Sequence, residues 1–218
     1  MQRFNYSTDE LKFINDFDML DSKYWESKVE CMSTIKGKIR GYFLPLQKNQ
    51  CCYCKMLKQE NHGKTWDIEH IFPRELYPHF TFIPLNLAIS CTECNGFKSH
   101  KEIRIKTSSK SSRYPSTGSN ICIIHPHFDN YDDHIKVTMG PDGRIFHTPI
   151  NKSKKGRATI IMCNLFRFQE QAFGHENFYK TSISNHITKT LLACITQNMS
   201  AQEMELAIKV AVEGAINY

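Results

Sequence analysis

The sequence predicts an α+β fold in which a small metal-binding module lies between helical segments. Two Cys-x-x-Cys pairs, Cys51/Cys54 and Cys91/Cys94, enclose 36 residues, which is more than a simple zinc ribbon needs. Within this insert, residues 66–70 alternate between apolar and polar side chains, as a strand does, until Pro73 interrupts the pattern. Apolar residues recur at helical spacing near both ends of the chain.

These patterns divide the chain into four segments. Residues 1–49 predict an N-terminal helical segment, and residues 50–106 the metal-binding core. Residues 107–120 have almost no apolar side chains and predict a flexible loop. Residues 121–218 predict a hairpin followed by a helical C-terminal extension.

Local signals predict individual elements. Ser7 with Glu10, and Ser200 with Glu203, have the spacing of capping boxes that begin helices. We expect a further helix over residues 23–40, a short strand over 121–124, and a hairpin over 135–147 that turns at 140–143.

Charge and composition favour a cytoplasmic protein with a nucleic-acid partner. The net charge is +6, and six basic residues against one acid lie between positions 98 and 113. Two more basic clusters are Lys36, Lys38 and Arg40, and Lys152, Lys154, Lys155 and Arg157. Residues 1–30 hold seven acids and four bases, which suits docking onto a basic partner. No apolar run reaches the roughly 20 residues of a membrane helix, and no secretory pattern begins the chain.

The two cysteine pairs predict a structural zinc site. Nine cysteines, an odd number without a secretion signal, argue against a disulfide framework. Two knuckles supply four thiolates, which close a tetrahedral site and leave no open position for catalysis. Cys52 is a less favourable ligand because only one residue separates it from Cys54.

A second set of polar residues between the knuckles suits metal-assisted phosphodiester hydrolysis: Asp67, Glu69, His70, Asn86 and Asn95. Carboxylate and amide oxygens suit Mg²⁺ or Mn²⁺, and a neutral imidazole can take a proton from water. In a strand, Asp67 and Glu69 face one side and His70 the other, so a turn after His70 has to re-aim them.

This order of residues resembles the HNH, or ββα-metal, nuclease family. The resemblance rests on the first knuckle, residues 67–73, Asn86-Leu87 and residues 91–98, about a quarter of the chain. It implies that His70 is the general base and that Glu69 and Asn95 bind the catalytic divalent ion. It further implies that Asn86 holds the loop that orients the histidine. Asp67 then supports the metal site.

Further expectations follow from the resemblance and the basic segment. Lys98 would contact substrate phosphate, and Lys101 and Arg104 extend the basic surface. Asn95 stands where many relatives have a histidine, and His100 is a possible substitute ligand. His125, His127, Asp129 and His134 suggest either a second metal site or a loop beside the hairpin.

Residues 124–160 look like the extension of a bacterial HNH subgroup that includes the nuclease subunit of Septu-type anti-phage systems, which works with an ATPase subunit. The resemblance implies a DNA endonuclease acting in defence. Two alternatives stay open: a stand-alone restriction or mobile-element nuclease, and a zinc-knuckle nucleic-acid-binding module without catalysis.

Overall fold

The computed structural model describes residues 4–18, 21–59, 65–105, 113–141, 143–170 and 183–216. The chain divides into two compact units. The first comprises Met1–Thr92 and Ser99–Thr117, and the second comprises Glu93–Lys98 and Gly118–Tyr218. Helices and two small antiparallel sheets make up these units, so the predicted α+β class is confirmed.

The first unit begins with helices. The predicted capping box begins α1 (Thr8–Asn15): the Ser7 side chain accepts from the Glu10 backbone, and Glu10 accepts from the Ser7 backbone. α2 (Glu30–Leu46) lies against both strands of the first sheet, with Ile35 and Ile39 fully buried. The predicted helix over residues 23–40 was therefore wrong at its start, because a 3₁₀ turn over Ser22–Glu26 takes the first residues.

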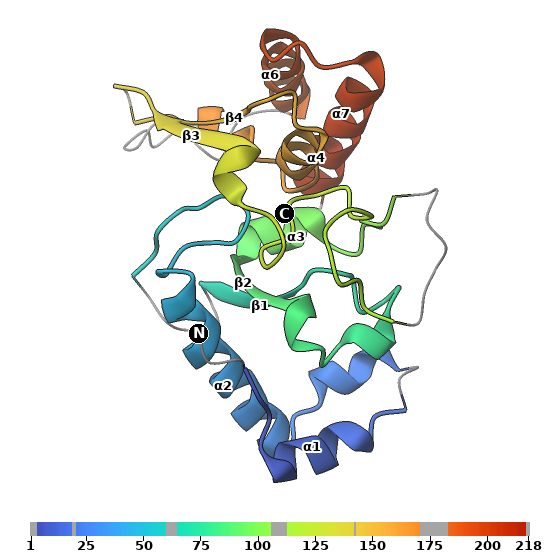
Figure 1. Cartoon of the computed structure of the whole chain (residues 1–218). Helices are drawn as coiled ribbons and strands as arrows, with labels where there is room; N and C mark the ends of the chain where they lie inside the picture. Colours follow the sequence, from blue (N-terminus) through green and yellow to red (C-terminus); the bar gives the residue numbers. More distant parts are fainter. Residues whose placement is uncertain are drawn as a thin grey trace. The chain divides into compact units, whose positions relative to one another are not determined.

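The first sheet is the hairpin of β1 (Trp66–His70) and β2 (Leu87–Cys91), which pair in antiparallel register from Trp66↔Cys91 to His70↔Leu87. All five residues of β2 are buried. The side chain of Gln47 covers the outer edge of β2, since its amide donates to Ile89 O and accepts from Ile89 N, both at 2.8 Å. Figure 1 shows the hairpin beside α2 and leading directly into α3 (Thr92–Lys98).

The second unit contains the predicted hairpin, β3 (Ile135–Met139) and β4 (Ile145–Pro149), paired from Ile135↔Pro149 to Met139↔Ile145. Gly143 lies in its turn with φ 78°, a backbone conformation that favours glycine. α4 (Lys154–Met162) contacts β4 and approaches the hairpin closely at Gly156. A Cβ on Gly156 would lie 2.3 Å from His134 O.

The described part of the second unit also contains α5 (Arg167–Glu170), α6 (Ile183–Thr196) and α7 (Ala201–Ile216). The predicted capping box at Ser200 is confirmed, because Glu203 accepts from the Ser200 backbone at 2.8 Å and donates its own backbone N–H to the Ser200 hydroxyl. Buried Ala207, Val210 and Ala211 give α7 its packing face.

Two predictions for the middle of the chain, a strand and a flexible loop, have different outcomes. The predicted strand at residues 121–124 was wrong: Ile121 forms a single bridge and the next two residues bend. The predicted loop over residues 107–120 lies partly outside the described residues, since 106–112 are not among them. Residues 113–120 contain bends and turns but neither helix nor strand.

Candidate functional site

The four cysteines of the two knuckles form a buried cluster. Their sulfur atoms all lie within 4.8 Å of one another, and Cys54 Sγ lies 3.9 Å from Cys91 Sγ. A tight turn holds the first pair, with Lys55 N donating to Cys51 O at 3.1 Å and Lys55 at φ 60°. Cys91 ends β2 and Cys94 lies one helical turn into α3, so the strand-to-helix junction sets the second pair.

This donor set fits one zinc ion. A tetrahedral site with Zn–S bonds of about 2.3 Å has neighbouring sulfurs about 3.8 Å apart. The Cys54–Cys91 separation of 3.9 Å matches that edge. All four cysteines are buried and none is joined in a disulfide. The predicted four-cysteine site therefore has the geometry for zinc, with every ligand position filled by sulfur.

Cys52 lies beside the cluster but outside it. Burial raises the pKa of its thiol well above the usual value, and its backbone N–H donates to Ile89 O at 3.0 Å. The four sulfurs brought together are those of Cys51, Cys54, Cys91 and Cys94. Cys52 thus has a buried thiol, and its backbone links the knuckle to β2.

Glu69 is almost completely buried, with 1% of its surface exposed. The hydroxyl of Tyr53, itself fully buried between the cysteines of the first knuckle, donates to Glu69 Oε1 at 2.8 Å. A carboxylate in such a place needs hydrogen bonds to offset the loss of water. The knuckle therefore fixes the orientation of the carboxylate that the resemblance assigns to the metal.

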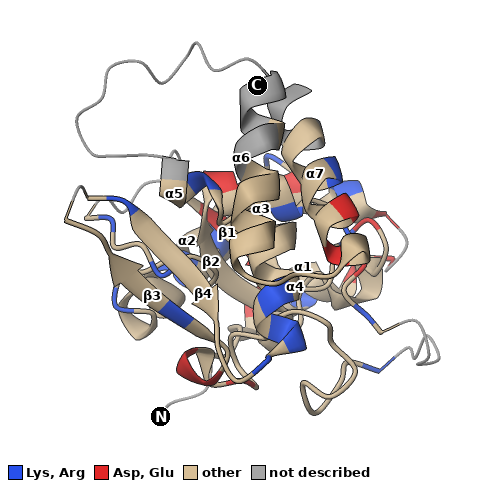
Figure 2. Ribbon diagram, turned by 90° about the horizontal axis from the view of Figure 1, so that it is seen from above, with Lys and Arg blue, Asp and Glu red and all other residues tan. Residues whose placement is uncertain are grey.

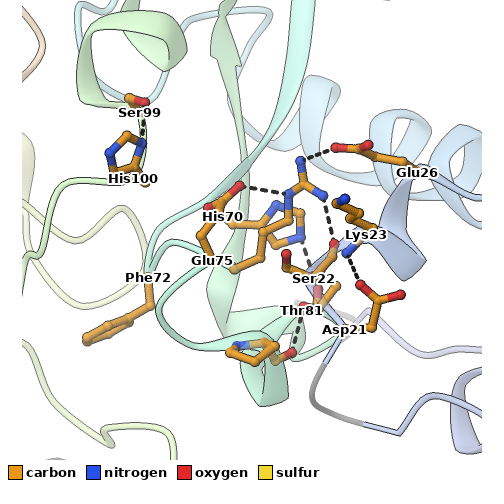
Figure 3. A network of polar contacts seen from close by, with 12 residues as sticks. Asp21, Ser22, Lys23, Glu26, His70, Phe72, Glu75, Thr81, Ser99 and His100 are labelled. Atoms are coloured by element: carbon orange, nitrogen blue, oxygen red, sulfur yellow. Dashed lines mark hydrogen bonds and ion pairs between the residues drawn. The ribbon is translucent and has the colours of Figure 1, made fainter.

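His70, the last residue of β1, has its ring packed edge-on against Trp25, with centroids 4.6 Å apart. His70 Nε2 lies 3.2 Å from Thr81 O, a contact drawn as a dashed line in Figure 3. A carbonyl oxygen only accepts, so Nε2 carries the proton of the neutral ring. The chain bends at residues 71 and 72, directly after His70.

Arg74 holds the 3₁₀ turn that carries Trp25. Its guanidinium donates to Ser22 O at 2.8 Å and to Glu26 Oε1 at 2.9 Å, the first and last residues of that turn. The hydrogen bond and charge of Arg74 lower the pKa of Glu26. These two hydrogen bonds fix the turn whose Trp25 packs against His70.

Asn86 is fully buried and bridges the loop between the two strands. Its Oδ1 accepts from Phe72 N at 2.7 Å, and its Nδ2 donates to Phe72 O and Phe80 O, each at 3.1 Å. These bonds occupy both polar atoms of the amide. Asn86 therefore holds the loop that begins at His70, and any part that it plays in catalysis stays a prediction.

The remaining predicted site residues differ in exposure. Asp67 and Asn95 are half-buried, on β1 and α3. Lys98 has 1% of its surface exposed, which sequence reasoning did not anticipate for a phosphate contact. Lys101 is half-buried, and the Arg104 guanidinium lies over the rings of Phe72 and Tyr77, 5.4 and 5.1 Å from their centroids.

His100, the possible substitute ligand, is exposed and lies apart from His70 in Figure 3, with its Nδ1 3.1 Å from the Ser99 hydroxyl. Among the residues that the structure describes, the four cysteines are the group of His, Cys, Asp and Glu side chains placed to hold a metal. A site for the catalytic ion therefore remains a prediction.

The His125–His134 segment forms a loop. The Asp129 carboxylate accepts from His125 N at 2.8 Å and from Lys155 Nζ at 2.6 and 2.7 Å. His125 stacks on Phe128 with centroids 4.1 Å apart, and His134 Nδ1 lies 2.7 Å from the Ser153 hydroxyl. These contacts match the loop interpretation rather than a second metal site.

In two of the predicted basic clusters, some side chains contact acidic or aromatic groups of the protein itself. Lys38 pairs with the buried Glu10 at 2.6 Å, and Lys36 lies 5.0 Å from the centroid of the Trp25 ring. On α4, Lys155 pairs with Asp129, while Arg157 reaches Glu203 at 3.4 Å. Figure 2 shows basic residues on α4 and along the β3–β4 hairpin. Because several basic side chains of these two clusters contact groups within the protein, fewer charges are available to a partner than the sequence suggests.

Together these features define an α+β protein with small antiparallel sheets and a candidate four-cysteine zinc site. The chain is 27% identical over 156 residues to Septu protein PtuB of Bacillus thuringiensis. That similarity covers 71% of this chain and 50% of the relative, so the chain spans about half the length of the curated protein that it matches. No family model and no solved structure matches the chain.

The predicted likeness to a Septu-type protein is thereby confirmed as a distant similarity. Within the part of the chain that the structure describes, none of the helices is long and apolar enough to cross a membrane. Sequence reasoning missed Tyr53 and Trp25 at this site. Their contacts with Glu69 and His70 join residues far apart along the chain, and no local pattern marks them.

Proposed function

We propose that this chain is a metal-dependent HNH endonuclease that hydrolyses DNA phosphodiester bonds. One observation supports this most: an antiparallel hairpin that follows the first cysteine pair leads directly into a helix that carries Cys94, with His70 at the end of the first strand. That order corresponds to the ββα arrangement that the resemblance implies. Asn86 holds the intervening loop against the strand ends.

His70 is the proposed general base. Because Nε2 is engaged with the Thr81 carbonyl, Nδ1 is the nitrogen that takes the proton from the attacking water. Trp25 against one side of the ring keeps this orientation. General-base catalysis of this kind contributes about 10²–10⁴-fold in rate.

Glu69 and Asn95 are the proposed ligands of Mg²⁺ or Mn²⁺, with Asp67 in support. Their carboxylate and amide oxygens suit a hard ion that keeps several waters and takes few protein ligands. Such an ion supplies stabilisation of the negative charge that develops on the phosphate and leaving oxygens. Tyr53 keeps the Glu69 carboxylate oriented before the substrate arrives.

Adjacent residues of β1 face opposite sides, so Glu69 and His70 approach one phosphate only from the end of the hairpin. The strand ends at His70 and the chain bends directly afterwards, which supports this location. Lys98, Lys101 and Arg104 are the proposed contacts to DNA phosphates. Because Lys98 is buried, its contribution requires a phosphate that reaches deep into the site.

Incubation of the protein with plasmid and Mg²⁺ or Mn²⁺, with and without EDTA, tests the activity. We expect cleavage that EDTA stops, and none from His70→Ala, whose zinc content and circular dichroism should match wild type. Cleavage by His70→Ala at the wild-type rate would refute the assignment. A wild-type protein that binds DNA and zinc without cutting would favour the zinc-knuckle binding module.

We further propose that the nuclease acts in anti-phage defence together with an ATPase subunit. The similarity to Septu protein PtuB and the Septu-like order of residues 124–160 support this role. Co-expression with a candidate ATPase should yield a complex that elutes as one species. Free cutting of DNA by the isolated chain at the rate of the mixture would instead favour a stand-alone nuclease.

A further inference from the structure

Arg167, at the start of α5, places a buried positive charge against a cysteine of the cluster. Only 6% of its side chain is exposed. Its Nη2–H donates to Cys94 Sγ at 3.1 Å, and Nη1 donates to Cys163 O at 2.8 Å and Asn164 O at 2.9 Å. The guanidinium therefore joins the end of α4 to the second knuckle.

In this contact the cysteine sulfur is the hydrogen-bond acceptor. A guanidinium is always charged and has donors but no acceptor, so Cys94 Sγ must accept the hydrogen bond. A cation removed from water needs a nearby negative charge. Glu93 forms an ion pair with Arg167 from the more exposed side, 3.8 Å from Nη2 and 43% exposed. The Cys94 sulfur contacts the guanidinium from the buried side, and as a zinc ligand it is a thiolate that carries negative charge.

We propose that Arg167 is a positioning residue of the zinc site, which compensates the charge of the metal–thiolate cluster and fixes the Cys94 sulfur. The proposal rests on the zinc part of the proposed function. Four thiolates and one Zn²⁺ carry a net charge of −2, and Arg167 brings the buried group to −1. Charge-assisted hydrogen bonds to ligands hold those ligands in place and retain the metal.

The surroundings of Arg167 set its geometry closely. Its guanidinium lies 4.2 Å from the ring centroid of Phe168 and 5.3 Å from that of Phe97. Asn164 adopts φ 46°, which turns the chain at the end of α4 where its carbonyl accepts from the arginine. A lysine would keep the charge but lose the planar fork that reaches sulfur and two carbonyls together.

Zinc retention tests the proposal without any cleavage assay. The zinc-loaded full chain is mixed with a colorimetric zinc chelator, and the rate of zinc release is compared for wild type, Arg167→Gln and Arg167→Lys. We expect release about ten- to a hundredfold faster from Arg167→Gln, the range for loss of a hydrogen bond to a charged group, and an intermediate rate from Arg167→Lys. Arg157→Gln, which removes an arginine paired with Glu203, is the matched control and should release zinc at the wild-type rate.

Cobalt substitution supplies a second readout that a purely structural role would not move. The sulfur-to-Co²⁺ charge-transfer band should shift in Arg167→Gln and remain in place in Arg157→Gln. Equal release rates with an unchanged cobalt spectrum would overturn the proposal. If Arg167→Gln fails to fold, the test uses Arg167→Lys instead. A zinc-release rate and a cobalt spectrum of Arg167→Lys that both equal those of wild type would then overturn the proposal. A wild type that retains zinc through Arg167 but never cuts DNA would leave this inference standing and refute the nuclease.

Discussion

The Asn86 amide bonds three backbone groups of fully buried residues, Phe72 N, Phe72 O and Phe80 O. Asn86→Ala leaves Phe72 N and Phe72 O unsatisfied, and Phe80 O keeps only its bond from Ile83 N at 3.1 Å. Each unsatisfied buried group costs about 1–3 kcal/mol. We expect the free energy of unfolding to fall by about 3–5 kcal/mol, measured by urea denaturation with zinc present.

Asn86→Asp sharpens this test, because it keeps the acceptor for Phe72 N but turns an oxygen toward two carbonyls. It should be at least as unstable as Asn86→Ala. Thr34→Ala, which removes an exposed hydroxyl bonded to Glu30 O, is the control and should change stability by less than about 0.5 kcal/mol. A stable Asn86→Asp would show that the loop does not depend on these bonds.

His125 predicts a pH dependence of stability. Burial lowers its pKa from 6.5 to about 3, helped by His127 and Lys155 and opposed by Asp129. The unfolded chain therefore binds a proton between pH 6.5 and 3 that the folded chain does not, so stability falls as pH falls through that window. Each unit below pH 6.5 costs about 1.4 kcal/mol.

Urea denaturation at pH 7.5 and 5.5, with zinc content checked at both, measures the effect. His125→Asn keeps an acceptor near the Nδ1 position, where His127 N donates at 3.2 Å, and carries no titrating group. Its stability should depend less on pH than that of wild type by about 1.4 kcal/mol over this range. Identical pH slopes for the two proteins would contradict the prediction.

At the level of elements, the first knuckle reaches the candidate active site through Tyr53. Its hydroxyl donates to Glu69 Oε1 at 2.8 Å from between two zinc-site cysteines. If Glu69 binds the catalytic ion, Tyr53→Phe should raise the Mn²⁺ concentration for half-maximal cleavage about tenfold, since it removes a hydrogen bond to a charged group. The maximal rate at saturating Mn²⁺ should change little.

Tyr24→Phe is the matched control, because the Tyr24 hydroxyl donates to Phe13 O at a similar 2.9 Å and does not contact Glu69. It should leave the Mn²⁺ dependence at the wild-type value. An unaltered Mn²⁺ dependence in Tyr53→Phe would show that the hydrogen bond from the knuckle does not affect metal binding by Glu69. Inactivity of every protein, wild type included, would count against the nuclease itself.

Elements with local signals could be predicted from the sequence, and those defined by distant contacts could not. The capping boxes at Ser7 and Ser200, the strand over residues 66–70 and the hairpin turn depend on neighbours a few residues apart. The start of α2 was misplaced because Arg74, some fifty residues later, holds the preceding turn at Ser22 and Glu26.

The same limit applies to the candidate site. The cysteine spacing predicted which four sulfurs come together, because the two members of each pair are only three residues apart along the chain. The bond from Arg167 to Cys94 spans 73 positions, and the burial of Lys98 depends on packing that its basic neighbours in sequence do not indicate. Packing across the chain, rather than residue type, decides these features.

For the whole molecule, the zinc site predicts that metal and fold are lost together. The four cysteines come from a turn before the first sheet and from the junction of β2 with α3, and structural zinc contributes folding free energy directly. Elemental analysis should find one zinc per chain. Cys54→Ser should lose that zinc and its cooperative unfolding transition, as should wild type after prolonged chelation, and added zinc should restore the transition in wild type alone.

Cys194→Ser separates the loss of a ligand from the loss of any buried thiol. Cys194 on α6 is fully buried, and burial raises its pKa to about 11, as expected of a core thiol outside a metal site. This variant should keep one zinc per chain and unfold cooperatively, with a modest loss of stability. Cooperative unfolding of zinc-free wild type at the same urea concentration as the zinc-loaded protein would show that the fold does not need the metal. The stability of this region would then be assigned to the packing of side chains around the knuckles.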